Sequence, residues 1–397
     1  MLWPATLGLL LTSTLASPLY SRQTSTLPAP GTRGPAPKSE WIAVYEAAKG
    51  AGKIPTFVSA KLSGAGNPYY PPGVDTGENG VCSWSAAACF GDDDISDAPD
   101  GMYGVSFDDG PLPSSPALYQ FLQKQNQTAT HFFIGTNIVN NPDVFRQALA
   151  SNAHIGVHTW SHPYMTTLND TQILGELGWT VQAIHDLSGG LIPKFWRPPY
   201  GDADNRVRAI AKEVFNLTLV GWNRDSDDWC LNESGGSSCG SYGPKSTDDL
   251  ENELRSWVVG GASPGIIGLE HELTSKSVGG FVNTYAGLKQ HGWDARCIPD
   301  LFNLSWYLNS ATNGQPIKSG VSIGAGLSSF PPTSSSIFEP TSTTSSPSAS
   351  LVLTSPVAAV ESISQAVQHI ASSATSYLAF SPFSVPLAFV LAAGLLA

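Results

Sequence analysis

The stretch Tyr103-Gly-Val-Ser-Phe-Asp-Asp-Gly-Pro111 is a short β-favouring run that ends in two adjacent carboxylates. Tyr103 to Phe107 predict a buried strand, and Gly110-Pro111 predict a turn after Asp108 and Asp109. Adjacent side chains that leave a strand point in different directions, so one acid could bind a metal while the other accepts a proton. Two neighbouring anions repel each other unless a cation lies close by. The alternative is a simple capped turn, because Asp-Gly and Gly-Pro are ordinary turn formers.

Strands and helices alternate from about residue 103 to residue 308. The clearest helix is Asp170 to Leu187, in which branched apolar residues form one stripe behind a cap at Asn169 or Asp170. Such alternation predicts an α/β fold with parallel strands and crossover helices, as an open sheet or a barrel. The other expected strands are 130–134, 154–157, 195–197, 217–222 and 265–269. The other expected helices are 115–125, 143–150, 205–214 and 281–291, and one more helix is expected after the capping-box pattern 246–249.

A pair of histidines follows the 154–157 strand. His158 and His162 are spaced at i and i+4, which would chelate one divalent metal if the loop turns helically. With Asp109 they would form a three-ligand site that leaves a position open for water, as in catalytic zinc sites. Either histidine alone is more often structural than a ligand, so the hypothesis depends on the pair lying near the two acids.

Three more polar clusters follow predicted strands. After 195–197, Arg197 could hold a carboxylate base bidentately, and a backbone N–H beyond the two prolines could face an oxyanion; the alternative is a rigid turn. Asp225 to Trp229 supply acids and an aromatic wall, or else an acidic surface loop or a calcium site. His271, flanked by two acids, suits a general acid, although a solvated histidine is the commoner reading. Parallel folds build their sites on the face where strands end, so the five clusters support one another.

These clusters resemble the five ordered motifs of the polysaccharide deacetylases with a NodB-homology domain, carbohydrate esterase family 4. Within that family the chain is similar to the fungal chitin deacetylases. The resemblance covers about residues 100–308, and it departs from the usual pattern at Ser106, where threonine is common. It implies a distorted, incomplete (β/α) barrel with a substrate groove. The matching segments are Ser106-Phe-Asp-Asp-Gly-Pro111, His158-x-x-x-His162, Arg197-Pro-Pro-Tyr200, Asp225-x-x-Asp-Trp229 and Leu269-x-His271.

The resemblance implies a metal-dependent hydrolase. It assigns the general base to Asp108, which Arg197 would orient. It assigns the zinc or cobalt ligands to Asp109, His158 and His162.

The remaining implied roles concern the substrate and the leaving group. The backbone N–H of Tyr200 would bind the oxyanion, and Asp228 would tune His271, the general acid. Trp229 and Leu269 would line the acetyl pocket. The acids on either side of His271 would raise its pKa.

The implied reaction is hydrolysis of the N-acetyl groups of N-acetylglucosamine units in chitin, which gives chitosan and acetate. The aromatic residues Trp160, Tyr164 and Trp229 are candidates for the substrate groove. A first alternative is the same chemistry on another acetylated glycan, such as xylan or peptidoglycan. A second is a wall-anchored carbohydrate-binding glycoprotein with no catalytic activity.

The ends of the chain predict export and attachment to a membrane. Met1 to Ala16 fit a signal peptide, being too short to span a bilayer. The apolar end of the chain, preceded by small residues that include the candidate attachment residue Ser373, fits a GPI-attachment signal, with a retained tail-anchor helix as the alternative. We therefore expect a secreted monomer at the cell wall and the outer face of the plasma membrane. The expected segments are 1–16, signal peptide; 17–100, flexible leader and loop-rich extension; 101–310, catalytic domain; 311–376, disordered Ser/Thr/Pro-rich stalk; and 377–397, GPI signal.

Cysteines, glycosylation sequons and charge agree with this location. The chain has five cysteines, which implies disulfides in a secreted protein. Cys230 and Cys239 are expected to close a local loop, and Cys297 could pair with Cys82 or Cys89, which leaves one cysteine unassigned. A net charge of −12 argues against a nucleic-acid partner. The candidate N-glycosylation sites are Asn126, Asn169, Asn216, Asn232 and Asn303.

Overall fold

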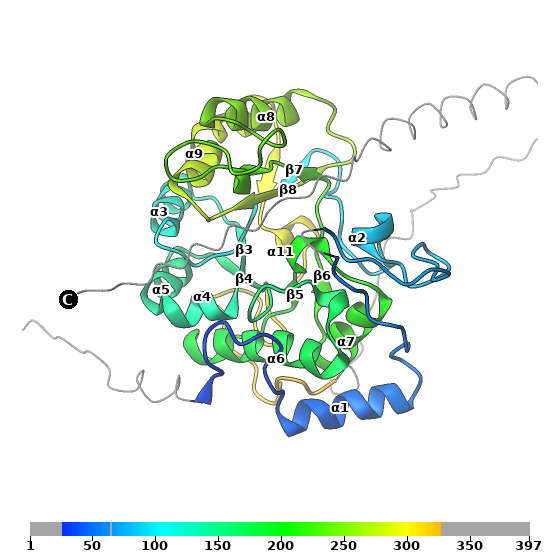
Figure 1. Ribbon diagram of the computed structural model, residues 1–397. Helices are drawn as coiled ribbons and strands as arrows, with labels where there is room; N and C mark the ends of the chain where they lie inside the picture. The colour runs from blue at the N-terminus through cyan, green and yellow to red at the C-terminus, as the bar shows by residue number, and fades with distance from the viewer. Residues whose placement is uncertain (1–25, 64–65, 327–397) are drawn as a thin grey trace, which may run out of the picture. The chain divides into compact units, whose positions relative to one another are not determined.

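Nine short strands, all paired in parallel, form the sheet on which the protein is built (Figure 1). The computed structural model describes residues 26–63 and 66–326. The strands are β1 (Met102–Gly104), β2 (Ser106–Asp108), β3 (Thr130–Phe133), β4 (His154–Val157), β5 (Phe195–Trp196), β6 (Thr218–Leu219), β7 (Arg224–Asp225), β8 (Ile266–His271) and β9 (Asp294–Arg296).

Seven of these strands follow one another around a ring that does not close. The pairing runs from β2 through β3, β4 and β5 to β6, and on the other side β2 pairs with β8, which pairs with β7. The ring is therefore open between β6 and β7, which are consecutive in the chain. Strands β1 and β9 extend the sheet beside β8. The predicted α/β fold, an incomplete (β/α) barrel, is confirmed.

A segment of the N-terminal extension lies at the opening of the ring. Ile95 forms a parallel bridge with Val220, just after β6, and Ala98 forms an antiparallel bridge with Gly265, just before β8. The side chain of Asn223 also donates a hydrogen bond of 2.6 Å to Asp97. Residues 95–98 thus connect the two sides of the opening.

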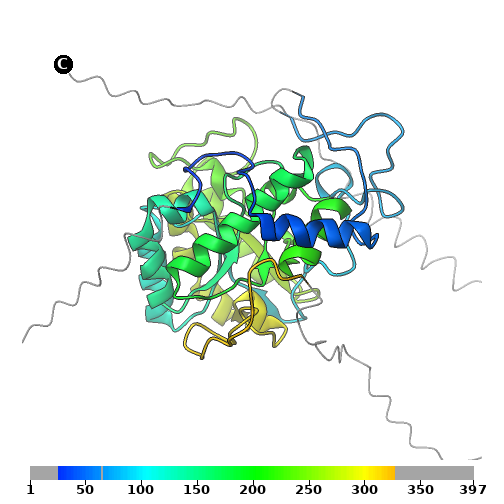
Figure 2. The same ribbon diagram turned by 90° about the horizontal axis from the view of Figure 1, so that it is seen from below.

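Helices surround the sheet and bury its outer face (Figures 1 and 2). Trp41 of α1 packs edge-to-face on Trp179 of α6 and Phe215 of α7. A continuous apolar core lies beneath the helices. They are α1 (Ser39–Gly50), α2 (Trp84–Ala87), α3 (Ser115–Gln125), α4 (Gly135–Asn140), α5 (Pro142–Ala150), α6 (Asp170–Leu187), α7 (Asn205–Phe215), α8 (Thr247–Val259), α9 (Ser275–Thr284), α10 (Ala286–Gln290) and α11 (Ile298–Leu301).

Helix α6 shows how directly local sequence sets an element. Its cap is Asn169, whose side chain accepts from the backbone of Gln172, while the Gln172 side chain accepts from the Asn169 N–H. This reciprocal pairing satisfies two N–H groups that a helix start leaves free. The bounds of α3, β4 and α6 are those predicted from the sequence.

Several elements differ from the prediction; the expected strand 217–222, for example, is reduced to β6 (Thr218–Leu219). The expected strand from Tyr103 to Phe107 is divided at Val105, because β1 pairs with β8 and β9 whereas β2 pairs with β3 and β8. The expected last helix begins earlier, at Ser275, where Thr274 and Ser277 form a capping box, and it is interrupted at Tyr285. Neither a change of strand partner nor a Thr/Ser capping box can be predicted from the pattern of hydrophobic residues.

The expected boundaries at both ends need correction. Residues 26–38 are not a free leader, because they hydrogen-bond to α6 through Gly34 and Ala36. Residues 311–326 are not part of a disordered stalk, since Val321 and Ile323 pack against the core. The predicted signal peptide, the remainder of the stalk, Ser373 and the GPI signal lie outside the described residues. Among the helices that are described, none is long and apolar enough to cross a bilayer.

The cysteines pair locally. Cys82 bonds to Cys89, and Cys230 bonds to Cys239 as expected. The expected pairing of Cys297 with Cys82 or Cys89 is wrong, because Cys297 is a free, buried thiol packed with Leu191, Trp306 and Tyr307.

Thiol titration tests this pairing. The native protein should react with no equivalent of a thiol reagent, because Cys297 is 0% exposed. After denaturation without reductant, one equivalent per chain should react, and Cys297→Ser should reduce that value to zero. A reactive thiol that remains in denatured Cys297→Ser would contradict the two disulfides.

Candidate active site

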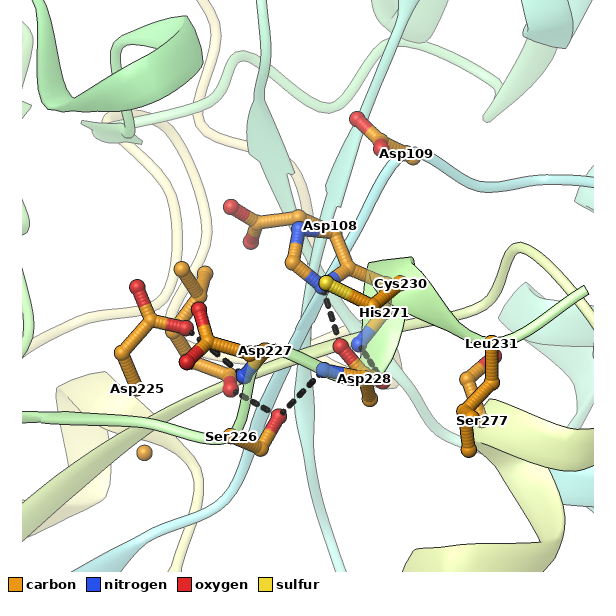
Figure 3. Close-up of polar contacts among 12 residues, drawn as sticks. Asp108, Asp109, Asp225, Ser226, Asp227, Asp228, Cys230, Leu231, His271 and Ser277 are labelled. Atoms are coloured by element: carbon orange, nitrogen blue, oxygen red, sulfur yellow. Dashed lines mark hydrogen bonds and ion pairs between the residues drawn. The ribbon is translucent and has the colours of Figure 1, made fainter. Parts of the chain in front are cut away.

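Several acids and His271 lie together at the carboxyl edge of the sheet (Figure 3). Asp108 ends β2 and lies in register with His271 at the end of β8. Both side chains are almost fully buried, with exposed fractions of 2% for Asp108 and 8% for His271. The pairing of β2 with β8 therefore brings together two residues 163 positions apart in the chain (271 − 108).

Arg197 fixes the position of Asp108. Its Nη1 donates a 2.8 Å hydrogen bond to Asp108 Oδ1, and its Nη2 donates to Ser106 Oγ at 3.0 Å. Nη2 also donates to the carbonyl of Gly221, and Nε donates to that of Val220. The contact with Asp108 uses one N–H, so the expected bidentate pair is wrong. The other donors tie the guanidinium, which is 0% exposed, to the backbone beyond β6.

Asp109, His158 and His162 place three ligand atoms within 4.8 Å of one another. Asp109 Oδ1 lies 3.3 Å from His158 Nε2 and 3.2 Å from His162 Nε2. The opposite nitrogen of His158, Nδ1, lies 2.7 Å from the carbonyl oxygen of Arg197. Because a carbonyl only accepts, Nδ1 of neutral His158 carries the proton, and its Nε2 turns a lone pair toward Asp109.

This arrangement fits a cation. Asp109 Oδ1 is buried and accepts no well-oriented hydrogen bond from any described residue. Although burial raises the pKa of Asp109, the positive charges of His162 and His271 hold it well below its ordinary value. A carboxylate and two imidazole nitrogens that converge on one point are a common donor set for zinc and similar metals.

The i, i+4 spacing of the two histidines suggested a helical turn, but the loop that carries them is not helical. Thr159 and His162 adopt left-handed backbone angles, with φ of 66° and 58°. Asp109 does so as well, with φ of 70°. The two imidazole centroids lie 5.0 Å apart. Non-glycine residues in this region cost backbone energy and cluster at functional sites, and here they aim the ligand atoms inward.

Asp228 holds His271. Its Oδ1 lies 2.6 Å from His271 Nδ1, and its Oδ2 accepts from the His271 backbone N–H at 2.8 Å (Figure 3). Burial lowers the pKa of His271, but the charge and hydrogen bond of Asp228, together with Asp109 and Asp108, raise it to about 10. His271 is therefore protonated at neutral pH in this arrangement.

The main causes of this raised pKa are Asp228, Asp109 and Asp108 rather than the acids beside His271, contrary to expectation. Glu270 points to Tyr103, whose hydroxyl lies 3.4 Å away, and burial raises the pKa of Glu270 well above its ordinary value. Glu272 contacts Nδ1 of His131 and accepts from the Tyr119 hydroxyl at 2.7 Å.

The other predicted residues surround this centre. Tyr200 has φ of 59° in the short turn Pro199–Gly201, is 48% exposed and stacks on Tyr164 at 4.0 Å between centroids. Trp229 is 36% exposed, and Leu269 is buried at 5%. Trp160, expected as a groove residue, is fully buried and belongs to the core.

Two buried acids that were not predicted from the sequence support the site from behind. Glu176 of α6 accepts hydrogen bonds from the loop that carries the histidines. Asp202 accepts from the backbone and hydroxyl of Thr166, further along the same loop. Glu176 lies within the turns of α6 that carry its apolar stripe. A charged residue among buried apolar positions is unusual, and this pattern in the sequence could have identified Glu176 as a candidate supporting residue.

The comparisons with known proteins agree with the site. The family described as "Polysaccharide deacetylase" matches residues 96–216. Chitin deacetylase 3 of Cryptococcus neoformans is 40% identical over 282 residues, which cover 70% of this chain and 67% of that protein. The chitin deacetylase of Amylomyces rouxii is 40% identical over 205 residues, 50% of this chain and 48% of that one. Chitin deacetylase 1 of Saccharomyces cerevisiae is 39% identical over 163 residues, 41% of this chain and 52% of that one.

The family match covers the segment that contains Asp108, Asp109, both loop histidines and Arg197. The identity with the Cryptococcus neoformans protein extends over two thirds of that relative. From these matches and the geometry of the strand ends, we conclude that the chain belongs to the polysaccharide deacetylase family.

Proposed function

We propose that the protein is a metal-dependent chitin deacetylase, which hydrolyses the N-acetyl groups of N-acetylglucosamine units and leaves chitosan and acetate. One observation carries the proposal: an acid held by Arg197 lies beside a three-residue metal-binding arrangement, in a chain 40% identical to a protein named chitin deacetylase. The names of the three relatives favour chitin over xylan or peptidoglycan.

Asp108 is the proposed general base. It is nearly buried, yet its Oδ1 is bonded to a guanidinium, which stabilises the carboxylate form. Its Oδ2 lies 3.7 Å from His158 Nε2, next to the proposed metal ligands. A water molecule between Asp108 and the acetamide carbonyl would give up its proton to this oxygen during attack.

Asp109, His158 and His162 are the proposed ligands of Zn²⁺ or Co²⁺. When bound, such a cation supplies Lewis-acid chemistry that favours attack on a carbonyl. The fixed tautomer of His158 keeps its Nε2 available as a ligand. The backbone N–H of Tyr200 is the proposed second contact for the developing oxyanion.

His271 is the proposed general acid. Deacetylation expels an amine, which leaves poorly unless it is protonated. Asp228 keeps His271 charged and fixes its ring through Nδ1, so that Nε2–H is the proton available to the substrate. Trp229 and Leu269 are proposed to border the acetyl group.

A non-catalytic carbohydrate-binding role is a weaker alternative, because the proposed base, acid and ligands are all present and converge. We also propose, from the sequence of the two ends, that the protein is secreted and GPI-anchored at the cell wall. The candidate N-glycosylation sites fit this location: Asn126, Asn169, Asn232 and Asn303 are exposed and Asn216 is half-buried.

Acetate release tests the proposed reaction. The protein should release acetate from N-acetylglucosamine oligomers, and much less from acetylated xylan or peptidoglycan. A chelator should abolish this activity, and added Zn²⁺ or Co²⁺ should restore it, because the ligand set needs a cation to act. Faster release from xylan or peptidoglycan would reassign the substrate, and chelator-resistant activity would remove the metal from the proposal.

Replacement of Asp108 tests the base. Asp108→Asn should lower kcat/KM by about 10²–10⁴-fold, since an amide cannot accept the proton. Its metal content, measured by atomic emission, should be unchanged. As a control, Asp186→Asn, which changes a half-buried acid near the far end of α6, should keep full activity. Substantial activity in Asp108→Asn would assign the base elsewhere.

The pH profile tests the acid. A general acid works while it is protonated, so activity should fall as the pH rises through the pKa of His271, which burial lowers and the charge of Asp228 raises. Asp228→Asn removes the charge that raises this pKa. The alkaline limb of kcat/KM should then move to lower pH by about one to three units. An alkaline limb at the same pH in both proteins would mean that His271 does not set it.

A further inference from the structure

Glu176 is a fully buried carboxylate that accepts four hydrogen bonds from uncharged donors. Its Oε2 accepts from the backbone N–H groups of Trp160 and Ser161, both at 2.8 Å. Its Oε1 accepts from the Ser161 hydroxyl at 2.6 Å and from the backbone N–H of Gly34 at 2.7 Å. Its exposed fraction is 0%, and no Lys or Arg among the described residues forms an ion pair with it.

The hydrogen bonds reach the loop between the two proposed histidine ligands. Trp160 and Ser161 lie between Thr159 and His162, the two loop residues with left-handed backbone angles. Such backbone angles are unfavourable for residues other than glycine and persist only where the surroundings impose them. Helix α4 also holds this segment, because the Gly135 N–H donates to the Thr159 carbonyl at 2.9 Å and the Thr136 N–H donates to the Trp160 carbonyl at 3.0 Å. Within the turn, the His162 N–H donates to the Thr159 hydroxyl at 3.2 Å.

The fourth donor comes from the N-terminal strap, by which we mean residues 26–38. The strap follows α6 closely, and it is the dark blue segment that precedes α1 in Figures 1 and 2. A Cβ at Gly175 would lie only 1.7 Å from the Pro35 carbonyl oxygen. The indole N–H of Trp179 donates to the Ala36 carbonyl at 2.8 Å, and Gly31 N–H donates to the Thr136 hydroxyl.

We propose that Glu176 is a positioning residue for the metal site, and that the N-terminal strap completes it. Glu176 holds the strained loop so that His158 and His162 converge on Asp109 before a cation binds. The strap covers the carboxylate and supplies its fourth hydrogen bond through the Gly34 N–H, so that no acceptor site of the buried oxygen is left without a partner on that side. This inference rests on the proposed metal-binding role of the two histidines.

The geometry distinguishes Glu176 from an ordinary structural acid. A buried carboxylate bonded to the ligand loop should change metal affinity when it is altered, as residues that orient metal ligands generally do. Asp204 offers the matched case. It is also 0% exposed and bonded to uncharged donors, the Val207 N–H at 2.9 Å and the Tyr70 hydroxyl at 2.8 Å, and it does not contact the loop.

The test measures Zn²⁺ affinity by competition with a chromophoric chelator, on the full secreted protein stripped of metal. Glu176→Gln presents an amide NH₂ where an acceptor stood, so part of the loop loses its partner. We expect its Zn²⁺ dissociation constant to rise about 10–100-fold. Asp204→Asn should lower the melting temperature of the metal-free protein and leave the Zn²⁺ dissociation constant unchanged.

A second variant reaches the strap without touching the loop. In Gly34→Ala the new Cβ would lie 2.6 Å from the Gln172 side chain, at a backbone φ of 56° that disfavours alanine. Its Zn²⁺ affinity should fall in the same direction as that of Glu176→Gln, by a smaller factor. If Glu176→Gln does not fold, the Zn²⁺ affinity of Gly34→Ala still tests the positioning role.

The outcomes separate this inference from the proposed function. If the unaltered protein binds Zn²⁺ and Glu176→Gln and Gly34→Ala bind it equally well, the positioning role is overturned while the metal site stands. If the unaltered protein does not bind Zn²⁺, both the metal site and the inference fail. Weakened binding in Glu176→Gln and Gly34→Ala, with unchanged binding in Asp204→Asn, supports the positioning role.

Discussion

The site depends on one electrostatic constraint: a buried carboxylate oxygen of Asp109 faces the Nε2 atoms of two imidazoles at 3.2–3.3 Å. In water these groups would interact weakly, but burial strengthens every charge and lone-pair interaction among them. The surrounding structure serves to keep them together. Arg197 contributes twice, because its guanidinium binds Asp108 while its carbonyl oxygen fixes the tautomer of His158.

Several acids at this edge of the sheet have separate environments, and these give them separate chemistry. Asp108 is bonded to Arg197, Asp228 to His271, and Glu272 to His131 and Tyr119. Among the described residues, the Glu270 side chain accepts only a 3.4 Å hydrogen bond from the Tyr103 hydroxyl, and burial raises its pKa. The partner that the fold supplies, rather than the acidic residue itself, sets the environment of each acid.

Much of this could be predicted from the sequence, and the failures have physical causes. Helix bounds such as Asp170–Leu187 follow from local capping and periodicity, and the strand-end clusters follow from the alternation of elements. The division at Val105 and the free thiol of Cys297 depend on which strands and segments become neighbours, which no local pattern encodes. The non-helical loop between His158 and His162 depends on Glu176 and other distant partners, so the i, i+4 spacing identified the pair and misjudged its backbone.

The bridge of residues 95–98 across the opening of the ring bears on where this domain begins. A piece that started at residue 101 would lose the partners of Val220 and Gly265 and would expose unpaired backbone groups on both sides of the opening. Exposed strand edges of this kind invite pairing between molecules and hence aggregation. Residues 95–98 therefore belong to the same folding unit as the sheet, and a fragment for crystallisation or display should retain them.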